Sequence, residues 1–329
     1  MKMRRRQFLH LAAVAVALPA VSRIAWAQTY PARPLTIIVP YAAGGPTDVI
    51  ARVLAERMRA QLGQPVLIEN VVGAGGSIAL GRVARASPDG YTIVLGNWGT
   101  HAALGAVYKL DYDLLKDFEP VAQVPGISNI IVTRKTVPAN NLKELIAWLK
   151  ANQDKVSVGT SGVGGASHIA GVFFQNAIGA RFQFVPYRGA APAMNDLVAG
   201  QIDLMVDGSP NCLPHLRTGA IKAYAVTTQS RLAAAPDVPT VDEAGLPGLH
   251  ITVWDGLWAP KGTPNNVVSK LNAAAVHAMA DSSVRARLND LGLQFPPREE
   301  QTPAALGALQ RAEIEKWWPI IKAAGIKAE

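Results

Sequence analysis

Three stretches of the sequence, each containing glycine before a predicted helix, combine the residue types that bind anions. The first, Pro40 to Asp48, reads PYAAGGPTD and lies between the apolar run LTIIV and a segment with helical periodicity. Gly44 and Gly45 let the backbone turn tightly and approach a ligand closely. Thr47 or Asp48 can cap the following helix, whose free N–H groups and positive dipole end attract a carboxylate or a phosphate. A plain strand-to-helix turn would have the same composition.

The second stretch, Thr160 to His168, reads TSGVGGASH and offers hydroxyls, a mobile backbone and a helix start. It lacks the Gly-Lys-Ser/Thr of a Walker loop and the G-x-S-x-G of a nucleophile elbow, and it is not a Rossmann fingerprint of a first βα unit. A hydrolase would pair Ser161 or Ser167 with His168. However, adjacency in sequence does not give nucleophile–base geometry, and no acidic orienting residue stands out. A lone histidine is more often a capping or packed residue.

The third stretch, Val185 to Pro192, reads VPYRGAAP and precedes another helix start. Tyr187 supplies an aromatic face, and Arg188 can grip a carboxylate bidentately or form a structural salt bridge. Asp207 ends a further strand, where it can accept a hydrogen bond from a ligand hydroxyl or amine, or cap the next turn. Ligands of open α/β sheets bind beyond the carboxyl ends of strands. The three stretches together therefore predict a cleft that closes around a small acid.

The elements that would position these stretches are strand-like runs alternating with helix-like runs. One helix is indicated by Ile50, Leu54, Met58 and Leu62, which repeat every four residues on one face. Such alternation predicts an α/β architecture with mostly parallel sheets. The strand-like runs span residues 35–39, 66–70, 91–96, 129–133, 156–160, 182–187, 203–208 and 222–227, and helical runs at the end span 267–279, 283–291 and 303–324.

Residues 1–27 have the pattern of an export signal, with basic residues, the apolar stretch LAAVAVALPA and small residues before Gln28. Arg5 and Arg6, followed by Gln-Phe-Leu, fit a twin-arginine signal, although an ordinary secretory signal has a basic start as well. No later segment reaches the 18 or so apolar residues of a membrane span. We therefore expect a mature protein in the periplasm, cleaved near Ala27 and Gln28.

Composition excludes several classes of protein. Removing residues 1–27 takes away five positive charges and lowers the formal net charge from +8 to +3. The excess of basic residues in the full sequence therefore does not indicate that the protein binds nucleic acid. Cys212 is the single cysteine, which rules out an intramolecular disulfide and a cysteine-based zinc site. About 300 residues remain, enough for two domains.

The sequence resembles the extracytoplasmic solute receptors of the tripartite tricarboxylate transporter family, also called Bug receptors. The matching segments run in family order over essentially the whole mature chain, and the pattern PYRG…DL..G.ID is especially specific. They are YPARPLTIIVPYAAGGPTDVIAR (30–52), GAGGSIALGRVARASPDGYTIVLGN (73–97), YDLLKDFEPVA (112–122), TSGVGGASHIAG (160–171), PYRGAAPAMNDLVAGQIDLM (186–205), PTVDEAGLPGL (239–249) and WDGLWAPKGTP (254–264).

This resemblance implies a type II periplasmic-binding-protein fold, in which two α/β lobes enclose a ligand cleft and are joined by two crossing strands. Lobe 1 would hold residues 28–126 plus 252–329, and lobe 2 would hold residues 127–251. The C-terminal helix with Trp317 and Trp318 would pack back on lobe 1.

The resemblance also implies a binding site. The loop matching Tyr41 to Asp48 would donate backbone N–H groups to a ligand carboxylate, often with bridging waters, and the loop matching Ser161 to His168 would hold it from the other lobe. More variable positions would read the far end of the ligand, and Asp207 matches a position that meets the amine in amino-acid-binding members. Gly165-Ala166 stands where hydroxyl residues are common, so one ligand or water contact is in doubt. The predicted binding residues are Tyr41, Ala43, Gly44, Gly45, Asp48, Asn97, Thr100, Ser161, Gly162, Gly164, Ser167, His168, Tyr187, Arg188, Asp207 and Trp254, with Trp98 and His101 as further candidates.

The implied function is that of a monomeric periplasmic solute-binding protein. It would capture a small mono- or dicarboxylate and deliver it to the membrane permease subunits of a tripartite tricarboxylate transporter, with no chemistry, metal, cofactor or nucleic acid. Trp98, Tyr187 and Trp254 would stack on an aromatic acid or form walls around an aliphatic diacid. One alternative is a ligand-sensing input for a signalling receptor, and a less favoured one is a periplasmic hydrolase.

Overall fold

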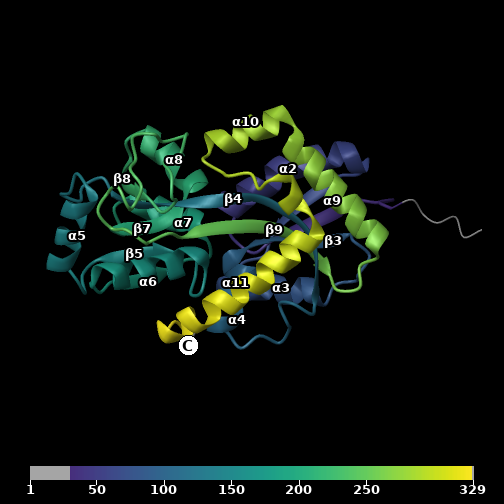
Figure 1. Ribbon diagram of the computed structural model, residues 1–329, viewed down its shortest axis with the longest axis horizontal. Coiled ribbons are helices and arrows are strands. Elements are labelled where there is room, and N and C mark those ends of the chain that lie inside the picture. The colour runs from purple at the N-terminus through teal and green to yellow at the C-terminus, as the bar shows by residue number, and fades with distance from the viewer. Residues whose placement is uncertain (1–29, 328–329) are drawn as a thin grey trace, which may run out of the picture. The chain divides into compact units, whose positions relative to one another are not determined.

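The computed structural model describes residues 30–327 (Figure 1). The predicted export signal, residues 1–27, lies outside these residues. Contacts divide the chain into two units between Ala32 and Arg33, and the description below concerns the unit that begins at Arg33. Among the described residues, no helix is both long enough and apolar enough to cross a membrane.

A nine-stranded sheet forms the centre of this unit, in the order β2-β1-β3-β9-β4-β7-β5-β6, with β8 also pairing with β4. The strands are β1 (Leu35–Val39), β2 (Val66–Asn70), β3 (Thr92–Asn97), β4 (Phe118–Arg134), β5 (Ser157–Thr160), β6 (Gln183–Pro186), β7 (Leu204–Gly208), β8 (Ile221–Val226) and β9 (Thr252–Pro260). The helices are α2 (Pro46–Leu62), η1 (Ala74–Gly76), α3 (Ser77–Ala84), η2 (Gly99–Ala103), α4 (Leu104–Val107), α5 (Leu142–Ala151), α6 (Ala166–Ile178), α7 (Ala190–Val198), α8 (Ser209–Arg217), α9 (Asn265–Ala280), α10 (Ser282–Asp290), η3 (Arg298–Gln301) and α11 (Pro303–Ala323).

Two strands, β4 and β9, connect two groups of mostly parallel strands (Figure 1). The first part of β4 pairs antiparallel with β9 from Phe118 to Ser128, and β9 pairs antiparallel with β3. The last part of β4, from Asn129 onward, pairs antiparallel with β7 and β8. Pairing is parallel between β1, β2 and β3, and again between β5, β6 and β7. The two-lobed α/β fold is confirmed, and β4 and β9 are its crossing strands. The lobe boundaries at 126/127 and 251/252 stay a prediction.

The sequence pattern did not reveal these crossing strands. The predicted run 129–133 is only the end of β4, and β9 was not predicted at all. Pro120 breaks the strand pattern because it cannot donate a ladder hydrogen bond, and the β4–β9 register shifts beside it and again between Val124 and Ile127. In β9 every residue after Thr252 is buried, so the strand has no alternation of apolar and polar residues to detect.

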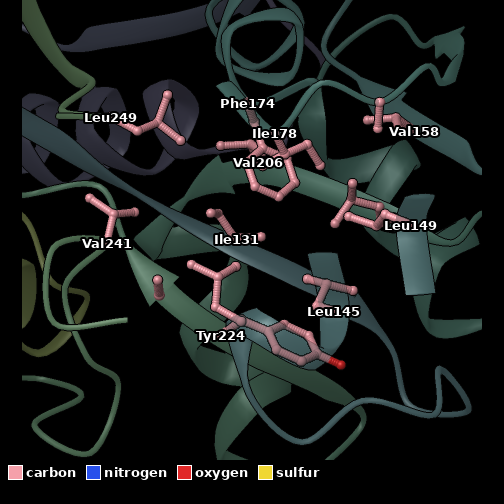
Figure 2. Close-up of a cluster of buried hydrophobic side chains, with 14 of the residues drawn as sticks. Ile131, Leu145, Leu149, Val158, Phe174, Ile178, Val206, Tyr224, Val241 and Leu249 are labelled. Atoms are coloured by element: carbon pink, nitrogen blue, oxygen red, sulfur yellow. The ribbon is translucent and has the colours of Figure 1, made fainter. Parts of the chain in front are cut away.

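Side chains along β4 alternate between two apolar clusters, as a strand covered on both faces requires. Ile131 packs with Leu145 and Leu149 of α5 and Phe174 of α6 in one cluster (Figure 2). Its neighbours Ile130 and Val132 point to the other face of the sheet and belong to a second cluster. That cluster includes residues of α7 and α8, such as Met194, Leu197 and Leu213. Because both faces are packed, the ends of β5 and β7 and the helices that follow them are held in fixed positions.

Candidate functional site

A cavity lies where strands end and helices begin, and the empty space in it, including space open to solvent, is about 410 Å³. The starts of α2, α6 and α7 and the ends of β3 and β7 contribute to its wall, as do residues of the crossing strands β4 and β9. Its lining consists of Tyr41, Gly45, Pro46, Thr47, Asn97, Ile127, Asn129, Ser161, Ala166, Ser167, Ala190, Asp207, Gly208 and Val253.

The helix starts present backbone N–H groups at this cavity. Gly45 caps α2 and Gly165 caps α6, both with extended ψ angles (171° and 162°) and without a side-chain cap. The first hydrogen bonds that close a helical turn are donated by Val49 to Gly45 (3.0 Å) and by Ile169 to Gly165 (3.1 Å). Between cap and donor, the N–H groups of Thr47 and Asp48 in α2 and of Ala166, Ser167 and His168 in α6 have no helical carbonyl partner, whereas Pro46 has no N–H. They are therefore available, together with the positive helix ends, to an anion.

The loop before α2 is held in place by a buried carboxylate. Asp48 Oδ2 accepts hydrogen bonds from the Gly44 N–H (2.8 Å) and from Arg52 Nε (2.8 Å). Asn70 Nδ2 donates to Asp48 Oδ1 and to the Tyr41 carbonyl, both at 2.9 Å. Burial alone would raise the pKa of Asp48, but the hydrogen bonds from Arg52, Gly44 and Asn70 outweigh it, and the pKa lies below its usual value. Asp48 therefore stays ionised and supports the loop, and the Gly44 N–H is already used.

The loop before α6 is held by neutral groups. Ser167 Oγ accepts a hydrogen bond from the Ser161 N–H (2.7 Å) and donates one to Ser161 Oγ (2.9 Å). His168 Nδ1 accepts from the Gly164 N–H (3.2 Å), and its ring meets Phe184 edge-on. Burial lowers the pKa of His168 to about 4, so the imidazole is neutral and its Nδ1 lone pair is engaged by the loop. Because no hydrogen bond joins either serine to this ring among the described residues, the hydrolase alternative gains no support.

A network of buried polar side chains forms one wall of the cavity. Asn97 Oδ1 accepts from the Tyr41 hydroxyl (3.2 Å) and from the Thr100 N–H (3.3 Å). Asn97 Nδ2 donates to Thr47 Oγ1 (3.3 Å). Burial is the main cause that raises the pKa of Tyr41 above its usual value, so its hydroxyl remains a donor. The directions of these bonds fix the orientation of the Asn97 amide.

The lining also includes an acid. Asp207, at the end of β7, is 3% exposed and accepts a hydrogen bond from Asn211 Nδ2 (2.6 Å). Burial raises the pKa of Asp207 to about 6, and the hydrogen bonds from Asn211 and Gly208 limit the rise. No Lys or Arg is found among the described residues that line the cavity. Within residues 30–327, no group of three or more His, Cys, Asp or Glu side chains is arranged to hold a metal ion.

Six of the predicted binding residues meet at this cavity: Tyr41, Gly45, Asn97, Ser161, Ser167 and Asp207. Sequence reasoning missed other lining residues. Five of them directly adjoin predicted residues or lie within the predicted loops: Pro46, Thr47, Ala166, Ala190 and Gly208. Assigning every residue of these loops and helix starts to the site would have included them. The remaining three lie on the crossing strands, and no local signal marks them: Ile127, Asn129 and Val253.

Several predicted residues lie behind the cavity or beside it. Asp48, Gly164 and His168 support the two loops, Thr100 supports Asn97, and Ala43 and Gly44 are exposed. Gly162, Tyr187 and Arg188 line a neighbouring cavity of about 740 Å³, which shares Ser161 with the first. Their direct contact with a ligand stays a prediction.

The three aromatic candidates all lie outside the lining of the 410 Å³ cavity. Trp98 is 1% exposed and meets Trp317 edge-on, with ring centroids 5.1 Å apart. The Tyr187 hydroxyl donates to Asp196 (2.6 Å), and Trp254 Nε1 donates to Glu313 (3.2 Å). The further candidate His101 is buried and stacks on Trp258, at a centroid distance of 3.6 Å.

Comparison with known proteins gives this geometry a family context. The family model described as tripartite tricarboxylate transporter family receptor matches residues 50–326. MatC from Rhodopseudomonas palustris, solved with bound malate, is 42% identical, with a TM-score of 0.86 over 89% of this chain and 100% of that one.

Two further solved structures are similar over most of their length. The periplasmic binding protein BugD is 43% identical, with a TM-score of 0.87 over 91% of this chain and 100% of that one. A second R. palustris protein, solved with adipate, is 33% identical, with a TM-score of 0.87 over the same shares of both chains.

Proposed function

Because the chain belongs to the tripartite tricarboxylate transporter receptor family, whose members are solute-binding receptors and not enzymes, we propose that it captures a small organic acid in the 410 Å³ cavity. The capture takes place in the periplasm, and the acid is then delivered to the membrane permease subunits of a tripartite tricarboxylate transporter. One observation carries the proposal: the N-termini of α2 and α6 open onto the same cavity.

The chemistry of the lining supports a carboxylate as the group that is bound. Backbone N–H groups at helix starts are donors that suit an anion, and Thr47 and Ser161 add hydroxyls. The absence of a Lys or Arg among the described lining residues leaves these neutral donors and the helix dipoles as the source of affinity. The malate and adipate of the solved relatives are ligands of this kind.

Contacts beside the cavity support a mechanism of closure. The Ala42 N–H donates to the Arg188 carbonyl (3.0 Å), and the Tyr108 hydroxyl donates to the Val163 carbonyl (3.0 Å). Each bond joins a loop of the β1–β3 group to a loop of the β5–β7 group. In the proposed cycle these bonds form when the lobes close on the acid and break when it is released. Closure then gives the permease a surface that differs between the loaded and the empty receptor.

The far end of the ligand meets Asp207 in this proposal. A hydroxyl or amine of the acid can donate to the Asp207 carboxylate, whereas a second ligand carboxylate at the same place would require Asp207 to be protonated. Since the pKa of Asp207 is about 6, a diacid oriented in this way should bind more tightly at pH 5 than at pH 8. A hydroxy acid or amino acid should show the opposite preference.

A thermal-shift panel on residues 28–329 tests the proposal, with carboxylic acids set against their amides. An acid at 100 times its dissociation constant adds about 2.7 kcal/mol to the free energy of unfolding and so raises the melting temperature. We expect a rise with at least one acid and none with its amide. Hits confined to neutral compounds would refute the carboxylate site. Loss of uptake of that acid in cells lacking this chain would test delivery to a transporter.

A further inference from the structure

Beneath the wall formed by Tyr41, Thr47 and Asn97 lies a carboxyl group that the binding site described above does not use. Asp255, in the middle of β9, is fully buried, and neither of its oxygens has a hydrogen-bond partner among the described residues. It stands directly opposite Asn97 in the antiparallel pairing of β3 and β9. The side chains of such a pair lie on the same face of the sheet, with Cβ atoms about 4.5–5.5 Å apart.

The hydrogen bonds around Asn97 leave one proton free. Asn97 Nδ2 donates to Thr47 Oγ1, so the Thr47 oxygen acts as an acceptor in that bond. The Thr47 hydroxyl proton has no acceptor within hydrogen-bonding distance and angle among the described residues. Two directions are open to this proton: inward, toward the Asp255 carboxyl, or outward, into the cavity that Thr47 lines.

The charge of Asp255 decides between these directions. An ionised Asp255 can only accept, so it would draw the Thr47 proton inward and would place a buried negative charge behind the helix start. A neutral Asp255 carries a proton of its own and can donate it to Thr47 Oγ1, which leaves the Thr47 proton to face a ligand. We infer that Asp255 is a positioning residue: a buried, neutral carboxylic acid that turns the Thr47 hydroxyl toward the bound acid. This inference rests on the proposed function for the identity of the ligand.

Burial favours the neutral form of the Asp255 carboxyl, because removing an isolated carboxylate from water has a large free-energy cost. It raises the pKa of Asp255 well above its usual value, and the neighbouring Thr47 hydroxyl offsets the rise only in part. Within residues 30–327, no cation lowers the pKa of Asp255 in return. Tyr41 is the titratable side chain that interacts electrostatically with Asp255, and its own pKa is raised as well.

Among the described residues of the other elements around β9, cations such as Lys316 of α11 are paired with other acids, in this case with Glu313. On α2, Asp48 and Arg52 pair with each other. On η2, burial lowers the pKa of His101 to about 3, so this ring is uncharged. On α11, Glu313 accepts a hydrogen bond from Trp254 Nε1. The β4 residue opposite Asp255 is Val124, which does not titrate.

The first test measures melting temperature against pH for the ligand-free chain and needs no knowledge of the ligand. A carboxyl whose pKa is raised by folding costs stability as pH rises from the unfolded value of about 3.9 toward the folded value. Asp255→Asn removes this cost, so its melting temperature relative to wild type should rise steadily from pH 4 to pH 8. The exposed Asp237→Asn should track wild type throughout and serves as the control. Parallel curves for Asp255→Asn and wild type would overturn the inference.

The second test measures dissociation constants for malate and adipate by calorimetry between pH 8 and pH 10, where Asp207, whose pKa is about 6, is already ionised. For wild type we expect weaker binding at the alkaline end, where Asp255 ionises and takes the Thr47 proton. Asp255→Asn, whose amide still donates to Thr47, should keep its affinity there. Thr47→Val should lose about tenfold or more at every pH, the equivalent of one hydrogen bond to a charged group. An alkaline loss that persists unchanged in Asp255→Asn would overturn the role assigned to Asp255.

The two tests separate failure of the inference from failure of the proposed function. If neither acid binds at any pH, malate and adipate are excluded as ligands of this chain, while the melting curves still decide whether Asp255 is neutral. If Asp255→Asn does not fold, a carbon-13 titration of the aspartate carboxyls in wild type replaces the first test. A buried carboxyl that stays protonated at pH 7 supports the inference, and its absence overturns it.

Discussion

The two loops that precede α2 and α6 are held in place by the same arrangement of hydrogen bonds but by different side chains. In each, a glycine caps the helix without a side chain of its own, and the third residue of the helix reaches back to accept an N–H from four residues earlier. In the first loop this residue is Asp48, which binds the Gly44 N–H. In the second it is His168, which binds the Gly164 N–H. Both loops are therefore fixed from behind, and the N–H groups of the helix start remain free in front.

The difference between the loops lies in charge. Asp48 is a buried anion that needs Arg52 and Asn70 as partners, whereas His168 is neutral and needs none. A negative charge near a helix N-terminus stabilises the helix but competes with an anionic ligand for the same dipole. Pairing with Arg52 reduces that competition. The comparison indicates that the α2 loop derives its rigidity from an ion pair, while the α6 loop derives it from neutral hydrogen bonds that are sensitive to acid.

The largest effect should come from a charge placed on the ligand side of the first loop. Gly45 has a negative φ of −76°, and an added Cβ would meet only ordinary contacts, the nearest being the Ala42 carbonyl oxygen at 3.5 Å. Gly45→Ala should therefore fold and bind nearly as wild type. Gly45→Asp should weaken binding of an acid by at least about 100-fold, because two like charges a few ångströms apart repel strongly. Calorimetry with the acid found by thermal shift measures both, and equal affinities would remove the first loop from the site.

Loss of the anchor of the first loop should be the next largest effect. Asp48→Ala leaves the Gly44 N–H and the Asn70 amide without their acceptor, and chemical denaturation should show a loss of about 2 kcal/mol, reduced because Arg52 is half exposed. The pKa of Asp48 is lowered by folding, so its contribution is present above the unfolded value of about 3.9 and is lost as pH falls through the folded value. A variant whose stability loss is the same at pH 3 and pH 7 would contradict this account.

The second loop should respond to mild acid, where the first does not. Folding lowers the pKa of His168 from about 6.5 to about 4, so the unfolded chain binds a proton in this window and the folded chain does not. Stability should therefore fall as pH falls from about 6.5 to about 4, by up to about 1.4 kcal/mol per unit. His168→Gln keeps an acceptor for the Gly164 N–H without titrating, and its denaturation curves should lack this slope. A slope of equal size in both proteins would assign it to another group.

The smallest effect should follow removal of the hydroxyl that ties the second loop together. Ser167→Ala loses the acceptor of the Ser161 N–H and the bond to Ser161 Oγ, at a cost of about 1 kcal/mol in stability and up to about tenfold in affinity. Ser167→Thr retains the hydroxyl and serves as the control. An affinity loss as large as that of Gly45→Asp would show that Ser167 itself is a principal contact with the ligand.

Local sequence was sufficient to predict the parts of the site that local chemistry controls. The composition of Pro40 to Asp48 and of Thr160 to His168 predicted glycine turns followed by helices, and both helices are present. The four-residue repeat of Ile50, Leu54, Met58 and Leu62 predicted the buried face of α2, and all four are buried. These features depend on backbone conformations and periodicities that are set within a few residues.

The tertiary structure alone decided which side chains share the cavity and in what chemical state. Asp48 and His168 look like candidate ligands in the sequence, yet they face the loops behind the helix starts. Asn97 and Asp255 become neighbours only through the pairing of β3 with β9, 158 residues apart in the chain. The neutral state that we infer for Asp255 has the same origin. Asp255 loses contact with water because several elements that are distant in the sequence pack around it. No local stretch of the sequence therefore reveals its burial.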